Sequence, residues 1–268
     1  MEGDGDESHR LWIGHGAFLG IFDFMNPAPS SMKSELFSLL RELAGARPYV
    51  SFAAVRSALG SSPLGEKPGL LREYLSEAMD KKLIHDAGRG WYSSLATTAV
   101  LDPEATAPLR GMLARRFPFL PHYVWSTRQV NPWTHHLLGK SVQFVQVERD
   151  GEDDVAAFLR KEGWSVIINP TTKTARDFAP GERSAVIRGI RRAFDPATEP
   201  KVGKVLVDLM LENSRLGLMD EGERQEMSRK LVTTHRVEMA GLLARLGKHR
   251  LDLVGLVGAE SKPIIGEK

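Results

Sequence analysis

The sequence predicts an α+β fold, in which a small helical unit with a β-hairpin is followed by a mixed α/β domain with a helical C-terminal part. Three observations lead to this prediction. Leucines recur at helical spacing within 36–43, and apolar residues alternate with polar ones along 142–148, which is the pattern of a half-buried strand. From Val202 to about Lys248 the apolar pattern is again helical. Strands and helices are therefore mixed along the chain, and helices dominate its end.

Length and composition favour a globular protein with two modest domains. The chain has 268 residues, of which 42% are hydrophobic and 26% charged, a balance that argues against disorder. Cysteine is absent, which excludes disulfides, thiolate metal sites and a cysteine nucleophile. The formal net charge of +2 is too small for a protein that binds polyanions over its whole surface. Any affinity for nucleic acid must therefore come from a local arrangement of cations.

Residues 1–30 form a glycine-rich extension that ends in a linker with two prolines. The apolar segment Leu11–Phe24 is interrupted by three glycines and is shorter than the roughly 18 residues that span a bilayer. It follows an acidic start, whereas a secretory signal begins with basic residues. We therefore expect a cytoplasmic protein that does not enter a membrane.

Residues 31–93 contain three short helical patterns followed by a turn rich in glycine. The expected elements are helices from Ser31 to Gly45, from Ser51 to Gly60 and from about Pro68 to Lys82, strands at 83–84 and 91–92, and a turn at 85–90. Three helices followed by such a hairpin is the order of a winged helix-turn-helix. We therefore predict that 31–93 is a DNA-binding domain.

The third of these helices has the two faces that a DNA-reading helix needs. Leu71, Leu75 and Ala78 form an inward apolar stripe, which leaves an outward polar face for the major groove. The helix end and the hairpin carry further cations where phosphates would lie. The residues that we expect to contact DNA are Lys67, Arg72, Ser76, Lys81, Lys82 and Arg89.

Acidic residues dilute this cationic face, so a winged helix that binds only a protein partner is the alternative. Across 31–92, nine lysines and arginines stand against seven carboxylates, which leaves +2. So small a charge also suits a homodimer on double-stranded DNA, because two half-sites sum their contacts.

The third segment, 98–268, alternates helical and strand-like patterns before it becomes wholly helical. The expected elements are helices at 109–115, 130–138 and 153–162, strands at 122–126, 142–148, 165–169 and 185–190, and helical stretches from Val202 and from Glu221 to about Lys248. The basic residues of its first helix are either a solvated face or a second patch that extends the DNA footprint. These residues are Arg110, Arg115 and Arg116.

Two groups of metal-ligating residue types occur in this segment. Adjacent His135 and His136 would point about 100° apart on a helix, whereas paired ligands prefer i,i+3 or i,i+4 spacing. An acidic cluster where a strand turns into a helix suits a magnesium nuclease, but it equally suits the positive end of the helix dipole, which we favour. Its members are Glu148, Asp150, Glu152, Asp153 and Asp154.

Other catalytic patterns are missing from the sequence. There is no glycine-rich phosphate loop and no G-x-S-x-G elbow, and no nucleophile is matched with a base. We therefore predict a protein that is not an enzyme and that has no metal or cofactor, with the magnesium nuclease as the enzymatic alternative.

Four segments of the third part occur in an order that resembles a known family. They are Val124-Trp125-Ser126-Thr127-Arg128-Gln129-Val130-Asn131, Val145-Gln146-Val147-Glu148, Val166-Ile167-Ile168-Asn169-Pro170 and Lys204-Val205-Leu206-Val207-Asp208-Leu209. Together with the preceding winged helix, they resemble the AbiEi-type antitoxins of bacterial abortive-infection (type IV) toxin–antitoxin systems, over about residues 31–250. Gly203 stands where the resemblance leads us to expect Glu.

The resemblance implies an antitoxin of phage defence that is also the transcriptional repressor of its own operon. The N-terminal domain would bind promoter DNA. The domain at 98–268 would counter a cognate nucleotidyltransferase-like toxin, directly or functionally. Arg128 and Asp208 are the polar residues of this domain that we single out, although each also suits an internal ion pair or a cap.

Overall fold

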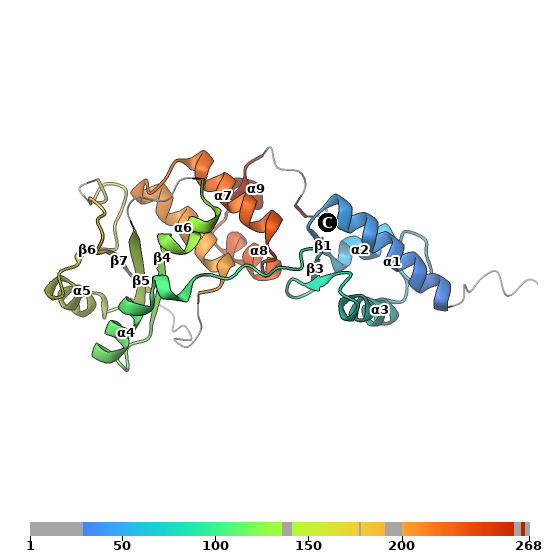
Figure 1. Cartoon of the computed structure of the whole chain (residues 1–268), viewed down its shortest axis with the longest axis horizontal. Coiled ribbons are helices and arrows are strands. Elements are labelled where there is room, and N and C mark those ends of the chain that lie inside the picture. Colours follow the sequence, from blue (N-terminus) through green and yellow to red (C-terminus); the bar gives the residue numbers. More distant parts are fainter. Residues whose placement is uncertain (1–28, 136–140, 177, 191–199, 260–263, 266–268) are drawn as a thin grey trace, which may run out of the picture.

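The computed structural model describes residues 29–135, 141–176, 178–190, 200–259 and 264–265. It is an α+β structure with two sheets, and Figure 1 shows an N-terminal helical part and a C-terminal α/β part following one another along the long axis. No helix in the described ranges is long and apolar enough to cross a membrane. Most of the expected extension lies outside the described residues, and its last two residues already belong to the first helix.

The N-terminal part combines three helices with a three-stranded antiparallel sheet of order β1-β3-β2. Its elements are α1 (Pro29–Ala46), β1 (Tyr49–Ser51), α2 (Phe52–Ala58), α3 (Pro68–Asp80), β2 (His85–Asp86) and β3 (Trp91–Ser93). The three expected helices are confirmed. Strand β1 is too short to show a periodicity and was not predicted.

Strand β2 was predicted at 83–84 and instead begins two residues later. Lys82 follows α3 with a left-handed backbone (φ 57°), which turns the chain sharply. Leu83 and Ile84 then pack into the hydrophobic core of the three helices, and pairing with β3 starts only at His85. The apolar pair was therefore a sign of burial and not of a strand.

One hydrophobic core holds the N-terminal helices together. Its members include Leu36, Leu40, Val55, Leu59, Leu71 and Leu75, all of them buried. Burial of a leucine or valine side chain contributes about 2 kcal/mol. The side chain of Ser51 accepts a hydrogen bond from the N–H of Ala54 at 3.0 Å, so it caps α2 as the sequence predicts.

The C-terminal part is built on a four-stranded mixed sheet of order β4-β5-β7-β6, in which only the β4–β5 pair is antiparallel. Its elements are the 3₁₀ helices η1 (Pro103–Ala105) and η2 (Thr127–Trp133), the strands β4 (His122–Ser126), β5 (Val142–Glu148), β6 (Ser165–Ile168) and β7 (Ser184–Ile190), and the helices α4 (Ala107–Arg116), α5 (Glu152–Lys161), α6 (Val202–Leu216), α7 (Glu221–Thr234), α8 (Met239–Lys248) and α9 (Leu253–Val257). The four expected strands and the helices corresponding to α4 and α5 are confirmed. The helix expected at 130–138 is instead η2, and residues 136–138 lie outside the described residues.

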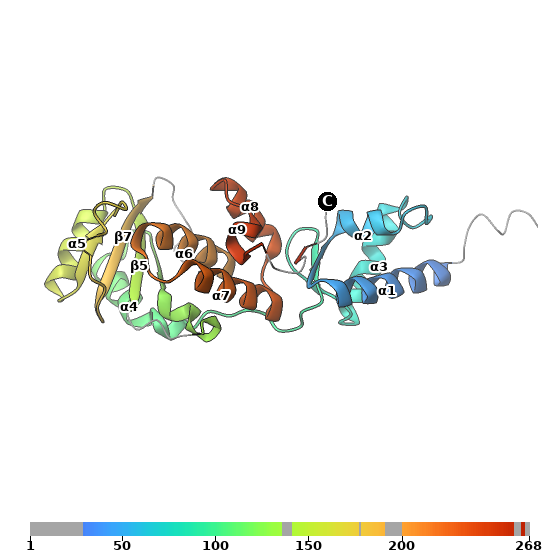
Figure 2. The ribbon, with the colours of Figure 1, turned by 90° about the horizontal axis from the view of Figure 1, so that it is seen from above.

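Alternate residues of the strands face different helical layers. Val124 and Val145 face the core that includes α4 and α5, whereas Trp125 and Phe144 face the core that includes α6. The Trp125 and Phe144 rings stack with 4.0 Å between their centroids. Figure 2 shows the sheet between α5 on one side and α6 on the other. The domain is therefore layered, with the sheet in the middle.

The helical stretch expected from Glu221 to about Lys248 is divided into α7 and α8. The segment between them runs beside residues 97–99: the N–H of Arg236 donates to the Thr97 carbonyl at 2.7 Å, and the Arg236 carbonyl accepts from Ala99 at 2.9 Å. The break between the helices therefore depends on hydrogen bonds to a distant segment of the chain. The apolar periodicity of 221–248 gives no indication of it.

The same segment joins the two parts of the molecule. The hydroxyl of Tyr49 donates to the carbonyl of His235 at 3.1 Å. The carbonyl of Ala87, which follows β2, accepts a hydrogen bond from the N–H of Met239 at 2.8 Å. Tyr49 is fully buried, and burial raises the pKa of its hydroxyl to about 12.

Candidate nucleic-acid interface

Helix α3 turns one apolar face inward and one polar face outward. Leu71, Tyr74, Leu75 and Ala78 are buried, whereas the outward residues include Arg72, Glu73, Ser76 and Asp80, all of them exposed. Pro68 occupies the first turn, where its missing N–H costs no hydrogen bond, and Lys67 precedes it. The expected two faces of this helix are therefore confirmed.

The side chain of Arg72 lies next to the hairpin. Its guanidinium stands over the ring of Phe52, 5.0 Å from the centroid. Phe52 in turn donates its N–H to the carbonyl of Gly90 in the hairpin turn, at 2.7 Å. A cation over an exposed aromatic face gains ~0.5–1 kcal/mol. Arg72 is therefore held on the side of α3 where the hairpin lies.

Lys81 is turned toward α1 instead. Its ammonium lies 2.9 Å from a carboxylate oxygen of Glu77 and 5.2 Å from the centroid of the Phe37 ring. Lys33 of α1 pairs with the same carboxylate at 2.5 Å, and hydrogen bonds from Lys33 and Lys81 lower the pKa of Glu77. Lys81 is thus directed into a contact between α3 and α1.

Lys82 and Arg89 are exposed at the end of α3 and in the hairpin turn. Arg89 stands between two glycines with positive φ, Gly88 at 93° and Gly90 at 70°, a conformation that costs little without a Cβ. Burial lowers the pKa of nearby His85, and the charges of Arg236 and Lys82 lower it further. Both effects favour the neutral form of this histidine.

One side of the hairpin turn is covered by the C-terminal helices. A Cβ on Gly88 would lie 2.5 Å from a carboxylate oxygen of Glu238 and 3.0 Å from the Cβ of Ala240. The carbonyl of Ala87 accepts hydrogen bonds from the first turn of α8. Only the side with Arg89 and Gly90 is exposed.

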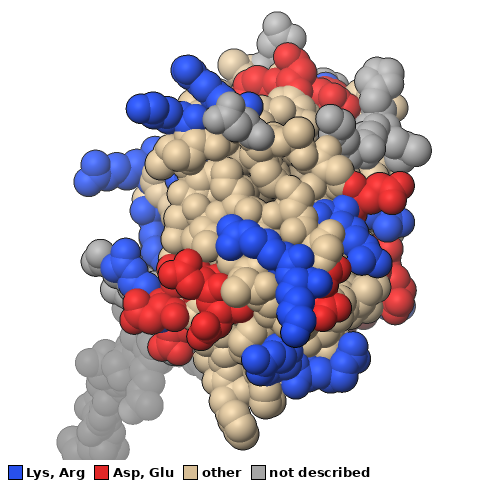
Figure 3. All heavy atoms as spheres, turned by 90° about the vertical axis from the view of Figure 1, so that its left-hand side faces the viewer, with Lys and Arg blue, Asp and Glu red and all other residues tan. Residues whose placement is uncertain are grey.

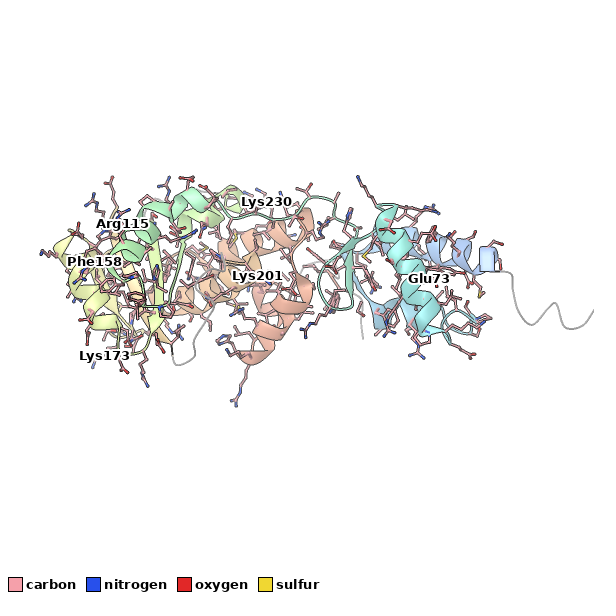
Figure 4. All side chains as sticks on the ribbon, turned by 90° about the horizontal axis from the view of Figure 1, so that it is seen from below. Glu73, Arg115, Phe158, Lys173, Lys201 and Lys230 are labelled. Carbon is pink, nitrogen blue, oxygen red and sulfur yellow. The ribbon has the colours of Figure 1, made fainter. Side chains whose placement is uncertain are left out.

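The three arginines of the expected second basic patch do not lie on one surface. Arg110 lines a cavity near the middle of the molecule, whereas Arg115 and Arg116 are exposed on α4. Figure 4 places Arg115 at the opposite end of the molecule from Glu73 of α3. Figure 3 shows positive and negative side chains interspersed on that end. These arginines therefore do not adjoin α3.

Asp208 lies in a polar cluster between α6 and β5. The ammonium of Lys204 is 2.5 Å from Asp208 Oδ2 and 2.8 Å from Gln146 Oε1, and Gln146 Nε2 donates to Asp208 Oδ2 at 3.0 Å. Lys204 also stands over the Tyr123 ring, 3.6 Å from its centroid. Burial lowers the pKa of Lys204, and the carboxylate of Asp208 opposes this shift. Two of the segments that carry the family resemblance thus meet here.

Arg128 is not part of this cluster. It is exposed in the first turn of η2, and its backbone N–H donates to the hydroxyl of Ser126 at 3.2 Å. No hydrogen bond or ion pair among the described residues joins it to Asp208. Gly203, next to the cluster, lies against α8, and a Cβ there would be 3.3 Å from the Cβ of Leu242. A glutamate at this position would push against α8.

Two arginines with internal partners, one half-buried and one fully buried, were not predicted from the sequence. Arg188 makes a two-pronged pair with Glu212, at 2.9 and 2.6 Å, and Arg224 is fully buried, where it donates to the carbonyls of Gly255 and Leu256 and to Glu221. For Arg188, the signal in the sequence was Glu212, a carboxylate within an apolar helix. For Arg224, it was Glu221 three residues earlier, at helical spacing. Both arginines are bound internally and serve packing.

The carboxylates of the acidic cluster are not gathered around one point in the described structure. Among the described residues, no three histidine or carboxylate side chains are placed to hold an ion. Glu152 starts α5, where its carboxylate accepts hydrogen bonds from the N–H of Asp150 at 2.6 Å and from Asn169 at 3.4 Å. His135 lies 4.0 Å from Glu226, and His136 is outside the described residues.

Comparison with known proteins identifies one family. A family of unknown function (DUF6577) matches residues 70–250, which is more than half of the chain. No curated protein matches, and no solved structure matches.

Proposed function

Since the chain belongs to the DUF6577 family, whose function is unknown, we propose from its own residues that it is a promoter-binding autorepressor and the antitoxin of a toxin–antitoxin operon. In this proposal, residues 31–93 are a winged helix-turn-helix that binds double-stranded DNA. Residues 98–268 are the antitoxin domain. A repressor of this kind acts in the cytoplasm, where the promoter is.

The order of elements in the N-terminal part supports a winged helix. It runs α1, β1, α2, α3, β2, β3, and the last two strands form a hairpin that pairs with β1. In a winged helix, the third helix enters the major groove and the hairpin lies on the flanking backbone. Helix α3 and the β2–β3 hairpin would take these roles.

The observation that carries the DNA-binding proposal is the position of Arg72 beside the hairpin turn. Phe52 contacts both the Arg72 guanidinium and the Gly90 carbonyl, so the cations of α3 and of the turn belong to one surface. Exposed Ser76 on α3 and Arg89 in the turn extend this surface. Cations there would neutralise phosphates while α3 reads base edges. Repression would follow from occupancy, because a bound protein excludes polymerase.

Binding of the full chain to its own upstream DNA, titrated against salt, tests this proposal. Each phosphate that the protein neutralises contributes about −0.9 to the slope of log K against log salt. We expect specific binding with a slope of a few units. Affinity no greater than for unrelated DNA of equal length would reject the repressor role. A length series of the DNA would separate a homodimer on two half-sites from a monomer.

The antitoxin half of the proposal rests on the resemblance of four segments to the AbiEi-type antitoxins. The Lys204–Asp208–Gln146 cluster supports it, because it holds two of these segments in one arrangement. The test is co-expression with the product of the adjacent gene, which we expect to be a nucleotidyltransferase-like toxin. Growth that is restored by this chain supports antitoxicity, and continued growth arrest rejects it.

A protein-binding winged helix is the second candidate. Exposed Glu73 and Asp80 lie on the outward face of α3, where they would repel phosphates. This candidate predicts a complex with the toxin and no specific affinity for the promoter. Size-exclusion chromatography of the two proteins, with and without promoter DNA, separates the two functions.

A further inference from the structure

A cavity of about 970 Å³ lies where the linker between the two parts meets the C-terminal domain. Residues 98–103 form one side, the β4–β5 face with Tyr123 and Gln146 another, and the start of α6 with one face of α8 the third. Lys201, labelled in Figure 4, is at the start of α6 in the middle of the molecule. Small-molecule sites typically have volumes of about 300–1,000 Å³, so this cavity is large enough for a metabolite.

The lining of the cavity is strongly positive. Its positively charged residues are Arg110, Lys201, Lys204, Arg236, Arg245 and Lys248. Among the described residues that line the cavity, Glu238 is the one carboxylate. Against six cations, one carboxylate leaves an excess of five positive charges. Cations gathered in a concave site focus their potential and attract anions.

In the part of the chain that the structure describes, two of these cations have neither a carboxylate nor a hydrogen-bond acceptor beside the side chain. Arg236 donates to the carbonyls of Leu95 and Ala96, and Lys204 pairs with Asp208. Arg245 and Lys248, three residues apart on α8, form no ion pair with any carboxylate in the described ranges. Their charges act on Lys204 and contribute to lowering its pKa. The structure thus presents a pair of neighbouring cations without an anion.

Apolar side chains complete the lining. Leu101, Val237 and Leu242 are buried residues of the wall, and Val202 packs beside them. Between the apolar wall and the cations, Gln129 and Gln146 offer amide groups. A ligand that fits this lining has an anionic end and a body with apolar faces and hydrogen-bonding edges.

We propose that this cavity binds a nucleoside phosphate, with its phosphates at Arg245 and Lys248 and its base against the apolar wall. Phosphate oxygens accept charge-assisted hydrogen bonds from arginine and lysine, which are about twice as strong as neutral ones. The base supplies the flat apolar body, and its edges match amide groups. DNA is a poorer match, because duplex phosphates contact cations that protrude and not a concave wall.

Calorimetric titration of the full chain tests this site, with ATP as the probe and inorganic tripolyphosphate and adenosine as its two halves. We expect saturable binding of ATP, and binding about tenfold weaker or more for each half alone, since each loses one set of contacts. Exposed Lys248 can be changed without disturbing the core, so Lys248→Ala and Arg245→Ala are the test variants. Each should weaken ATP binding about tenfold. The control, Arg115→Ala, removes an exposed arginine outside the cavity and should leave the affinity unchanged.

Several results would overturn the proposal. One is the absence of saturable ATP binding, and another is tripolyphosphate binding as tight as that of ATP, which would assign no role to the apolar wall. Unchanged ATP affinity in both variants would also overturn it. A further contrary result is that neither the wild type nor Lys248→Ala binds ATP, and Lys248→Ala binds promoter DNA less well than the wild type. These cations would then belong to the DNA surface. The three outcomes measured with ATP and tripolyphosphate do not depend on whether the winged helix binds DNA.

Discussion

The hydroxyl oxygen of Tyr49 accepts a hydrogen bond from the backbone N–H of Val237, with 2.9 Å between the two atoms. The same hydroxyl donates to the carbonyl of His235. Tyr49 is in β1, whereas His235 and Val237 form the break between α7 and α8, so one buried side chain satisfies backbone groups from the far end of the sequence. The N-terminal helices are therefore tied to the C-terminal domain by a specific polar contact and not by apolar packing alone.

Removal of this hydroxyl should destabilise the protein. Tyr49→Phe leaves a buried N–H and a partly buried carbonyl without their partner, which costs about 1–3 kcal/mol of unfolding free energy. Urea denaturation measures the change. Tyr92→Phe is the matched control, because Tyr92 is also buried and its hydroxyl has no hydrogen bond among the described residues, so it should change the stability less. Equal losses in the two variants would contradict the assigned role of Tyr49.

The pKa of Tyr49 predicts a pH dependence of the same contact. Burial raises this pKa to about 12, from an unfolded value of 10.0. The folded state therefore holds the proton more tightly, and the stability that this provides is fully present below pH 10 and lost as the pH rises toward 12. The slope for one such group is ~1.4 kcal/mol per pH unit. The difference in unfolding free energy between the wild type and Tyr49→Phe should thus shrink over this range, and parallel curves would contradict it. Tyr123, whose pKa is also raised by burial, is common to both proteins and cancels.

The sequence predicted the elements whose own residues determine them. Helix α3 and strand β5 carry clear periodicities, and both formed within two residues of the expected bounds. The junction between the two parts was not predictable in this way. Strand β1 has three residues, and the break after Thr234 depends on hydrogen bonds to 97–99, more than a hundred residues away along the chain.

The same distinction applies to the candidate sites. Arg72 and Arg89 were predicted to face outward from helical phase and turn position, and both are exposed. The i,i+4 spacing of Glu77 and Lys81 is visible in the sequence, but the position of Lys81 over the Phe37 ring depends on how α1 packs on α3. Asp208 was singled out, but its partner Gln146 is 62 residues away, so only the packing of α6 on β5 brings the two together.

Replacement of Arg72 or Arg89 by alanine should weaken promoter binding and leave the fold intact, because both side chains are exposed. A lost phosphate contact lowers affinity on all sequences and reduces the salt slope by about one, whereas a lost base contact costs ~1–3 kcal/mol and relaxes specificity. Shift assays at two salt concentrations, on the operator and on a scrambled sequence, distinguish the two roles. Arg115→Ala is the control, since this exposed arginine lies at the other end of the molecule. Unaltered affinity in both variants would remove these residues from the interface.

The Lys204–Asp208 pair predicts a loss of stability when one charge is removed. Asp208→Asn keeps the shape of the side chain but leaves the largely buried ammonium of Lys204 without its carboxylate, which costs about 3 kcal/mol in comparable buried pairs. The double variant Lys204→Met/Asp208→Asn removes both charges and should recover much of this loss, because the desolvated cation is gone. Glu77→Gln, in the half-exposed pairs with Lys33 and Lys81, should change the stability far less, since solvent screens those charges. Thermal and urea unfolding of the three variants measure these differences. A double variant as unstable as Asp208→Asn alone would mean that the cluster stabilises the protein through its hydrogen-bonded shape and not through its charge.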